Sequence, residues 1–366
     1  MKKLLLVLIL ASTASAQKYV GVASCVNSGC HGATRPLSTT RVLQNEYFTW
    51  LGHDRHAQAY NILFSADSAR IAKNMRMRKP AYEEPLCLDC HATHVAASQQ
   101  QGRIDLGDGI QCETCHGPAS GWRAEHMREG WTHAQSVARG MLDLRNLTIR
   151  AAACNACHVG TQSKEVDHEL IASGHPLLIF ELDNYTESMP PHWNPNATHG
   201  LRAWAVGQAV KFSDAAGNLA RHAHGERWPE FSDMSCTNCH HELKNGKWRQ
   251  ERGWPDRAGL PAWSPQHWSV LRPIVARVDP AAAKKLDALV PQLAVHVARM
   301  HDRKAIAQSA DAARAAIDGA LPRIQSASWS DEDVRAMIRA IAAGDAPADV
   351  QSAEQIALSL QSLAAA

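Results

Sequence analysis

Residues 109–130 read GIQCETCHGPASGWRAEHMREG and contain the motif that decides the architecture of this chain. The motif is a pair of cysteines with two residues between them and a histidine directly after the second cysteine. It recurs along the chain, and the copies together use all ten cysteines. The five copies are CVNSGCH (Cys25, Cys30, His31), CLDCH (Cys87, Cys90, His91), CETCH (Cys112, Cys115, His116), CNACH (Cys154, Cys157, His158) and CTNCH (Cys236, Cys239, His240).

This pattern is typical of covalent c-type haem attachment, in which both cysteines bond the porphyrin and the histidine binds the iron. Structural zinc sites and disulfide frameworks also use paired cysteines. Neither requires a histidine directly after each pair, and 20 histidines in 366 residues do not produce five such coincidences by chance. We therefore predict five covalently bound c-type haems, each with its iron.

The first motif differs from the others because four residues, Val26 to Gly29, separate its cysteines. The insert is rich in turn-forming residues. We expect it to bulge outward, so that both sulfurs still reach one porphyrin.

The first 16 residues have the pattern of a secretory signal peptide. Lys2 and Lys3 precede the apolar run 4–10, and Ala14-Ser15-Ala16 has the small residues of a cleavage site. The apolar run is shorter than the roughly 20 residues of a membrane-spanning helix. We expect an exported protein without a transmembrane anchor, located in the periplasm or on the outer surface.

The charge balance argues against nucleic acid as a partner. Loss of Lys2 and Lys3 with the leader brings 38 basic residues to 36, equal to the 36 acidic ones. We find no basic patch that would indicate nucleic-acid binding. Haem propionates would add negative charge, and arginines are the expected partners for some of them. The predicted partners are other redox proteins.

The composition changes near residue 270. All the motifs precede it, whereas the following stretches are rich in alanine and have helical apolar spacing, as in DPAAAKKLDALVPQLAVHVARM. Ser330 with Asp333, and Asp349, are the expected helix N-caps. We predict a mainly α protein with extensive loops: a signal peptide (1–16), a pentahaem domain built around stacked haems (17–270, helical near 42–62, 119–138 and 200–213) and a haem-free helical domain (271–366).

The quoted block around Cys112 resembles the cytochrome c-554 family, and so do TWLGHDRHAQAY at 49–60 and the order of the first four motifs. The resemblance implies that His56 binds the iron of the Cys112/Cys115 haem and that His126 binds the iron of the Cys25/Cys30 haem. His53 is the competitor of His56. The family's second haem, which matches Cys87/Cys90, has one open axial side, but this chain adds His94 there, so that His94 is a further candidate ligand.

The family has nothing that matches the fifth motif, so the ligands of the last two haems are left open. His168 and His175 are seven residues apart, on similar faces of a helix, and are our candidates. The reserve candidates are His192, His199 and either His222 or His224. The histidines expected to have other roles are His241, His133, His267, His296 and His301.

Together these features predict a carrier that passes electrons along a row of closely packed haems. The alternative is a multihaem oxidoreductase that acts on hydroxylamine or nitrite at one open iron near Cys87/Cys90. No CxxCK motif is present, which argues against the commonest nitrite-reductase signature. A third hypothesis is that the C-terminal helices dock a redox partner.

Overall fold

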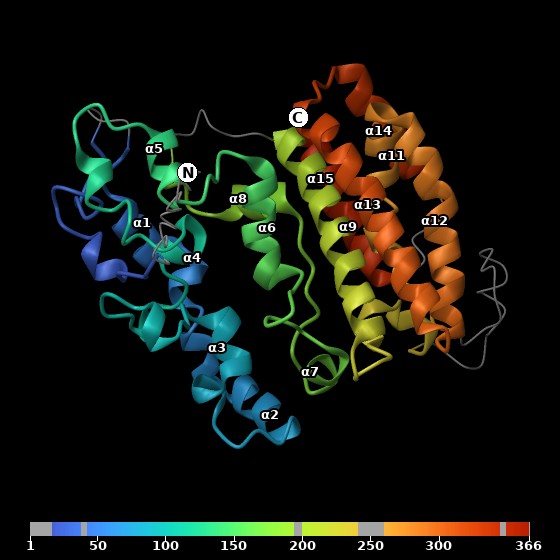
Figure 1. The fold of residues 1–366 in the computed structure, drawn as a ribbon, viewed down its shortest axis with the longest axis horizontal. Helices are drawn as coiled ribbons and strands as arrows, with labels where there is room; N and C mark the ends of the chain where they lie inside the picture. Colours follow the sequence, from blue (N-terminus) through green and yellow to red (C-terminus); the bar gives the residue numbers. More distant parts are fainter. Residues whose placement is uncertain (1–16, 38–41, 194–199, 241–259, 345–348, 366) are drawn as a thin grey trace, which may run out of the picture.

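The computed structural model describes residues 17–37, 42–193, 200–240, 260–344 and 349–365. Its chain forms two regions, which lie side by side in Figure 1. Residues 17–193 form a region of short helices and long connections, which we call the N-terminal region. The later residues form a bundle of long helices, which we call the C-terminal bundle.

The N-terminal region has α-helices of 5 to 12 residues, joined by loops and short 3-10 helices. Within the described residues, β pairing is limited to isolated bridges such as the one between Tyr19 and Gln100. The α-helices are α1 (Glu46–His53), α2 (Ala66–Asn74), α3 (Pro85–His91), α4 (Cys112–His116), α5 (His133–Ala138), α6 (Leu147–His158), α7 (His168–Ala172) and α8 (Leu182–Ser188).

The C-terminal bundle is held together by packing between α9 and α13. Small residues on one face of α13, among them Ala310, Ala313 and Ala320, are fully buried and let the two helices approach closely. Trp204 and Phe212 of α9 fill the space around them. The helices are α9 (Gly200–His224), α11 (Leu271–Val278), α12 (Pro280–Arg299), α13 (Arg303–Ser326), α14 (Asp331–Ala342) and α15 (Val350–Ala365).

The mainly helical fold is as predicted, and so are the caps. The Ser330 hydroxyl accepts from the Asp333 backbone N–H in a capping box, and Asp349 accepts from the Ser352 N–H. The predicted helix near 42–62 is shorter, because Asp54 has an extended backbone and starts a 3-10 turn instead. The stretch 119–138 is interrupted at Gly130, which has a φ of 73°.

The apolar core of the bundle extends to earlier parts of the chain. It includes α9, which precedes residue 270, and also Leu147 and Ala151 of α6 and Leu182 of α8. The predicted domain division at residue 270 stays a prediction about folding units. The packing shows that α9 shares one continuous core with the helices that follow that residue.

No described helix is long and apolar enough to cross a membrane. The predicted signal peptide at 1–16 lies outside the described residues, as do His199 and His241.

Candidate haem-binding sites

The five motifs lie on helices or tight turns, which bring both sulfurs and the imidazole of one motif to the same side. Three motif histidines are the last residues of their helices: His91 on α3, His116 on α4 and His158 on α6. The fifth motif begins the 3-10 helix η10 (Cys236–Asn238). Helical spacing places residues i, i+3 and i+4 on one face, as a porphyrin bonded twice and ligated once requires. None of the ten cysteines forms a disulfide in this structure.

The first motif closes in spite of its longer insert. The His31 backbone N–H donates to the Cys25 carbonyl at 3.2 Å, and the Cys30 N–H donates to Asn27 at 2.8 Å. In the fifth motif the corresponding bond joins the His240 N–H to the Cys236 carbonyl, at 2.8 Å. The turn absorbs the two additional residues and leaves the ends of the motif in the same relation. This geometry supports the predicted bulge.

The third motif is anchored by buried polar side chains. Glu113, inside the motif, accepts from the backbone N–H groups of Gly21 (2.7 Å) and Ala119 (2.7 Å). Gln111, directly before the motif, accepts from the Val22 N–H at 3.0 Å. Both side chains are almost fully buried. The segment before the first motif is thereby fixed to the third motif, which places the two motifs next to each other.

Each motif histidine faces the ring of a second histidine at nearly the same distance. The ring centres are 6.1 to 6.5 Å apart, although the partners lie far apart in the sequence. The pairs are His31 with His126 (6.2 Å), His91 with His175 (6.4 Å), His116 with His192 (6.5 Å), His158 with His56 (6.1 Å) and His240 with His168 (6.4 Å).

This separation fits a metal ion between two imidazoles. Metal–imidazole bonds are about 2 Å long and the ring centre lies about 1 Å behind the nitrogen, so one ion with two imidazoles separates the centres by about 6 Å. Ordinary aromatic contacts vary over a wider range, roughly 4.5 to 7 Å. Five pairs at almost one distance, each including a motif histidine, match the donor set of a haem iron with two axial imidazoles.

The hydrogen bonds of these imidazoles also suit metal ligands. In six of the ten paired histidines the Nδ1 atom contacts an oxygen atom, which leaves Nε2 for a metal. Asp54 and Glu46 supply carboxylates, and the other four contacts are to backbone carbonyls. The contacts are His31 with Glu46 (3.0 Å), His56 with Asp54 (2.9 Å), His91 with Ala59 (3.0 Å), His175 with Pro176 (2.8 Å), His192 with Pro190 (3.4 Å) and His126 with Arg123.

Burial keeps several of these imidazoles neutral. It lowers the pKa of His116 to about 4 and that of His158 to about 4. The pKa values of His91 and His192 are also lowered, again chiefly by burial. In contrast, the hydrogen bond to Asp54 raises the pKa of His56. A neutral imidazole has the free lone pair that a metal requires.

The structure places the expected ligands beside particular motif histidines. His126 faces His31, as the resemblance implies. His56 faces His158 and not His116, whose partner is His192. His175 faces His91, and His168 faces the fifth motif.

For two further histidines, the position in the structure differs from the role that the sequence indicated. His94 was a candidate ligand, but its Nδ1 contacts Asp89 at 2.7 Å, and it forms none of the five pairs. His192 was only a reserve, yet it faces His116. Its sequence context, Pro190-Pro191-His192, is a signal that could have raised its rank, because two prolines fix the backbone before it.

Five of the other described histidines have contacts of a different kind. His222 contacts a carboxylate on each side, and the Nε2 atom of His133 contacts Asp143 at 2.8 Å. His267 is buried against Trp263, and His296 contacts Ser309. The Nδ1 atom of His301 contacts the Arg299 carbonyl. None of these contacts corresponds to an axial ligand of one of the five motifs.

The motifs approach one another in an order that differs from their order in the sequence. Cys90 lies close to Cys157, so the second and fourth motifs meet. Cys115 lies within electrostatic range of Cys154, and Cys112 lies within range of Cys25. The third motif also adjoins the second, because the hydroxyls of Thr114 and Thr93 are 2.8 Å apart, so the third motif lies beside the other three.

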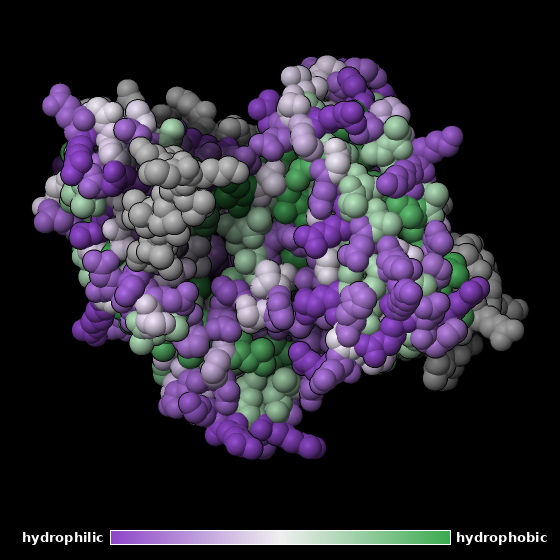
Figure 2. Space-filling view, in the orientation of Figure 1, coloured by the Kyte–Doolittle hydropathy of each residue, from purple (hydrophilic) through white to green (hydrophobic). Residues whose placement is uncertain are grey.

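A largely apolar cavity of about 540 Å³ lies beside His158. Figure 2 shows green, apolar residues in the hollow between the two regions of the molecule. Residues 177–179 form one wall, and α15 of the C-terminal bundle forms another. The lining residues are His158, Leu177, Leu178, Ile179, Tyr185, Glu354, Ala357 and Leu358. A flat apolar group bonded to the fourth motif would be enclosed partly by α15.

Large apolar side chains are exposed near the motifs. In the described part of the chain, ten of the eleven exposed large apolar side chains precede residue 240. Ile62 and Phe64, with 53% and 58% of their surface exposed, are examples. Covering such a side chain gains about 1.5–3 kcal/mol. These surfaces suit apolar macrocycles held by the neighbouring cysteines.

Comparison with known proteins agrees with this chemistry. Residues 23–117 match the family model of cytochrome c554 and c-prime. No curated protein and no solved structure gives a significant match. The matched segment includes the first three motifs, the helix before His56 and the Nδ1 partners of His31 and His56. The chain is thus similar to the cytochrome c554 and c-prime family over residues 23–117, which supports a c-type cytochrome with covalently bound haem and a role in electron transfer.

Proposed function

We propose that the protein is an exported, periplasmic pentahaem cytochrome that carries electrons along a row of haems, each iron bound by two histidines. The observation that carries this proposal is the pairing of every motif histidine with a second histidine at 6.1 to 6.5 Å. Haem iron supplies reversible one-electron chemistry when it is bound in such a site.

The side chains hold the imidazoles and limit their movement. Carboxylates and backbone carbonyls fix the Nδ1 side of six rings, so that each ring keeps its orientation in both redox states. Two strong ligands per site leave no position for a substrate. A carrier requires this arrangement, because it has to change its charge with little structural change.

The order of the sites defines the proposed route. The third motif lies beside the first, the fourth and the second, and the second also meets the fourth, so the four sites form one connected group. His168, at the start of α7, faces the fifth motif histidine, and His175, seven residues later, faces the second. The fifth site therefore adjoins the second. The first and fifth sites are the proposed ends of the row, where redox partners would exchange electrons.

The alternative function requires an open iron at the Cys87/Cys90 site. His175 faces His91 there, at 6.4 Å, and this favours the carrier. A hydroxylamine- or nitrite-converting enzyme would need His175 to leave that position. The docking of a partner by the C-terminal helices stays a prediction. The cavity beside His158 instead supports a role for α15 as a wall of the fourth haem site.

Mass spectrometry and a redox titration test this function. The mature protein, produced in a host that matures c-type cytochromes, should have the mass of the polypeptide plus five haems. A spectroscopic titration should show five one-electron transitions and no change of the reduced spectrum with nitrite or hydroxylamine. Fewer haems, or binding of either compound to the resting protein, would count against the proposal.

A further inference from the structure

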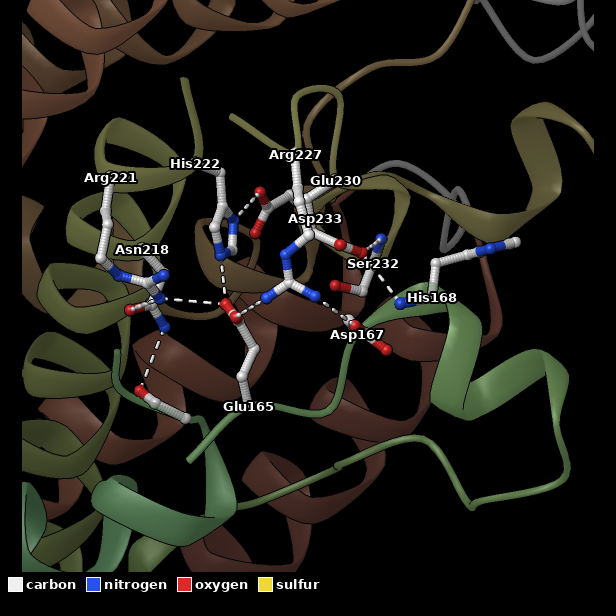
Figure 3. A network of polar contacts seen from close by, with 11 residues as sticks. Glu165, Asp167, His168, Asn218, Arg221, His222, Arg227, Glu230, Ser232 and Asp233 are labelled. Atoms are coloured by element: carbon white, nitrogen blue, oxygen red, sulfur yellow. Dashed lines mark hydrogen bonds and ion pairs between the residues drawn. The ribbon is translucent and has the colours of Figure 1, made fainter. Parts of the chain in front are cut away.

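His222 lies near the end of α9, at the centre of a polar network that contains no residue of a haem motif (Figure 3). Its Nδ1 atom is 2.6 Å from an Asp233 carboxylate oxygen, and its Nε2 atom contacts Glu165. Only 10% of the His222 side chain is exposed. The two carboxylates belong to different segments of the chain, and both point at the same imidazole.

The geometry requires a charged imidazole. A carboxylate only accepts hydrogen bonds, so both ring nitrogens of His222 have to donate. Burial alone would lower the pKa of His222, but the hydrogen bonds with Asp233 and Glu165 outweigh it and raise that pKa to about 9. Because both nitrogens are engaged, His222 has no lone pair left for a metal. This excludes His222 as an axial ligand in the described structure.

Two arginines complete the network on the side of Glu165. Arg221 Nη2 is 3.0 Å from Glu165, and Arg227 lies 3.8 Å from Glu165 and 3.2 Å from Asp167. Glu230 lies within electrostatic range of Asp233. Three carboxylates, of Glu165, Asp167 and Asp233, therefore contact three cations, and Glu230 lies near Asp233. Without the charge on His222, the two buried carboxylates next to it would lose their nearest cationic partner.

The segments joined by this network carry both candidate ligands of the fifth iron. Glu165 precedes α7, whose first residue is His168, and the His168 backbone N–H donates to Glu230 at 2.9 Å. Asp233 ends the 3-10 helix η9 (Phe231–Asp233), three residues before Cys236. The ring of His168 also contacts Phe231 of that helix. The His222 side chain bonds both segments at once, and so does that of Glu230, which accepts from the backbone N–H groups of His168 and Ser232.

We propose that His222 is a positioning residue, which holds α7 and the segment before Cys236 together so that His168 and His240 face each other across one iron. The proposal rests on the proposed function, because it requires a haem at the fifth motif. The proposal gives His222 a specific role at that site. It also explains why the last turn of α9, in addition to its apolar face, is linked to the haem region.

The substitution His222→Phe tests this role, with His224→Phe as the matched control. Phenylalanine keeps the ring but removes both hydrogen bonds and the charge. His224 is two residues further on the same helix and is exposed. In His222→Phe we expect five haems by mass and a new high-spin ferric signal of one haem equivalent by electron paramagnetic resonance. Added imidazole should restore the low-spin state. The His224→Phe protein should match the wild type.

A merely structural role gives a different result. In that case His222→Phe would lower the thermal unfolding midpoint and leave all haems low-spin, and this result would overturn the proposal. If His222→Phe does not accumulate, His222→Gln decides, because the amide still donates to one carboxylate. We expect partial high-spin character there, and a fully low-spin His222→Gln protein would contradict us. A wild-type protein with fewer than five haems would instead refute the proposed function, whatever the variants do.

Discussion

The N-terminal region and the C-terminal bundle are stabilised in different ways. The bundle has one large apolar core, in which side chains such as Leu219, Ile317 and Leu293 are fully buried. The N-terminal region has two small clusters, one of them formed by Val22, Trp50 and Ala57, and it leaves many large apolar side chains exposed. A helical bundle can fold on its own side chains, whereas short helices with little core require another source of buried surface. Haem is the source that the motifs imply.

The largest expected effect follows from withholding haem. The full chain, produced without cytochrome maturation, should retain a protease-resistant C-terminal bundle and lose protection over residues 17–146, which contribute nothing to the bundle core. The reason is that the N-terminal region lacks a core once the porphyrins are missing. Limited proteolysis followed by mass spectrometry maps the protected segments. Equal protection of both regions would remove the distinction between them.

Truncation of a core side chain in the bundle should have the opposite signature. Leu219→Ala removes a fully buried side chain from α9 and should cost about 2–5 kcal/mol of stability in the bundle. The haem spectra should stay unchanged at temperatures where the bundle is folded. Thermal unfolding followed at a helix signal and at a haem signal separates the two effects. Val350→Ala, at a side chain with 66% of its surface exposed, is the control and should change stability by less than about 0.5 kcal/mol.

Loss of one axial ligand should change one site of the N-terminal region only. His175→Ala should open the iron at Cys87/Cys90, give one high-spin haem equivalent and allow nitrite or hydroxylamine to bind there. The His94→Ala protein should remain low-spin, because His94 contacts Asp89 and forms no pair with a motif histidine. Electron paramagnetic resonance of the two ferric proteins compares them directly. A high-spin signal in His94→Ala, with none in His175→Ala, would reverse our assignment.

The network that links the two regions should make stability depend on pH. The pKa of His222 is raised from 6.5 to about 9, so its contribution is complete below pH 6.5 and is lost as the pH rises through 9. Burial alone would raise the pKa of Glu165, but hydrogen bonds from His222 and Arg221 lower it from 4.5 to about 2. The contribution of Glu165 is complete above pH 4.5 and is lost as the pH falls through 2.

The network should therefore contribute most between pH 4.5 and 6.5. Thermal unfolding midpoints measured from pH 5 to pH 10 should fall on the alkaline side in the wild type. The fall of the unfolding midpoint with rising pH should be smaller in His222→Phe, which lacks the titrating group. An identical slope in both proteins would show that other groups cause the decline.

The smallest expected effect concerns a cap within the bundle. Ser330→Ala removes the hydroxyl that accepts from the Asp333 N–H at the start of α14, and this should cost about 1 kcal/mol. The haem sites lie elsewhere and should not respond. A change in any haem potential would mean that the bundle and the haem sites are coupled more closely than their separate cores suggest.

The sequence alone was sufficient for the local features. Motif spacing gave the haem-attachment cysteines and the motif histidines as predictions, and the match over residues 23–117 supports the family. The caps of α14 and α15 were also predictable, because a cap depends on residues three positions apart. His126 faces His31 as the resemblance implies, since it lies in the segment that the family shares.

The long-range pairs were much harder to predict. His56 and His158 are about 100 residues apart, and only the packing of α4 against α6 brings them together. His192 follows two prolines outside any helix, so no periodicity marked it as a ligand. The role of α9 was missed for the same reason: its apolar face matches α13, which is separated from it by a long stretch of chain. Pairing across such distances depends on the assembled fold.

The central claim is that every iron has two histidine ligands, and one measurement on the wild-type protein tests it most directly. Magnetic circular dichroism in the near infrared, together with quantitative electron paramagnetic resonance of the fully oxidised protein, identifies and counts the ligand pairs. We predict that all haem is low-spin with the signature of two imidazoles, in five equivalents per chain. A high-spin equivalent, or a ligand pair other than two imidazoles, would contradict this account.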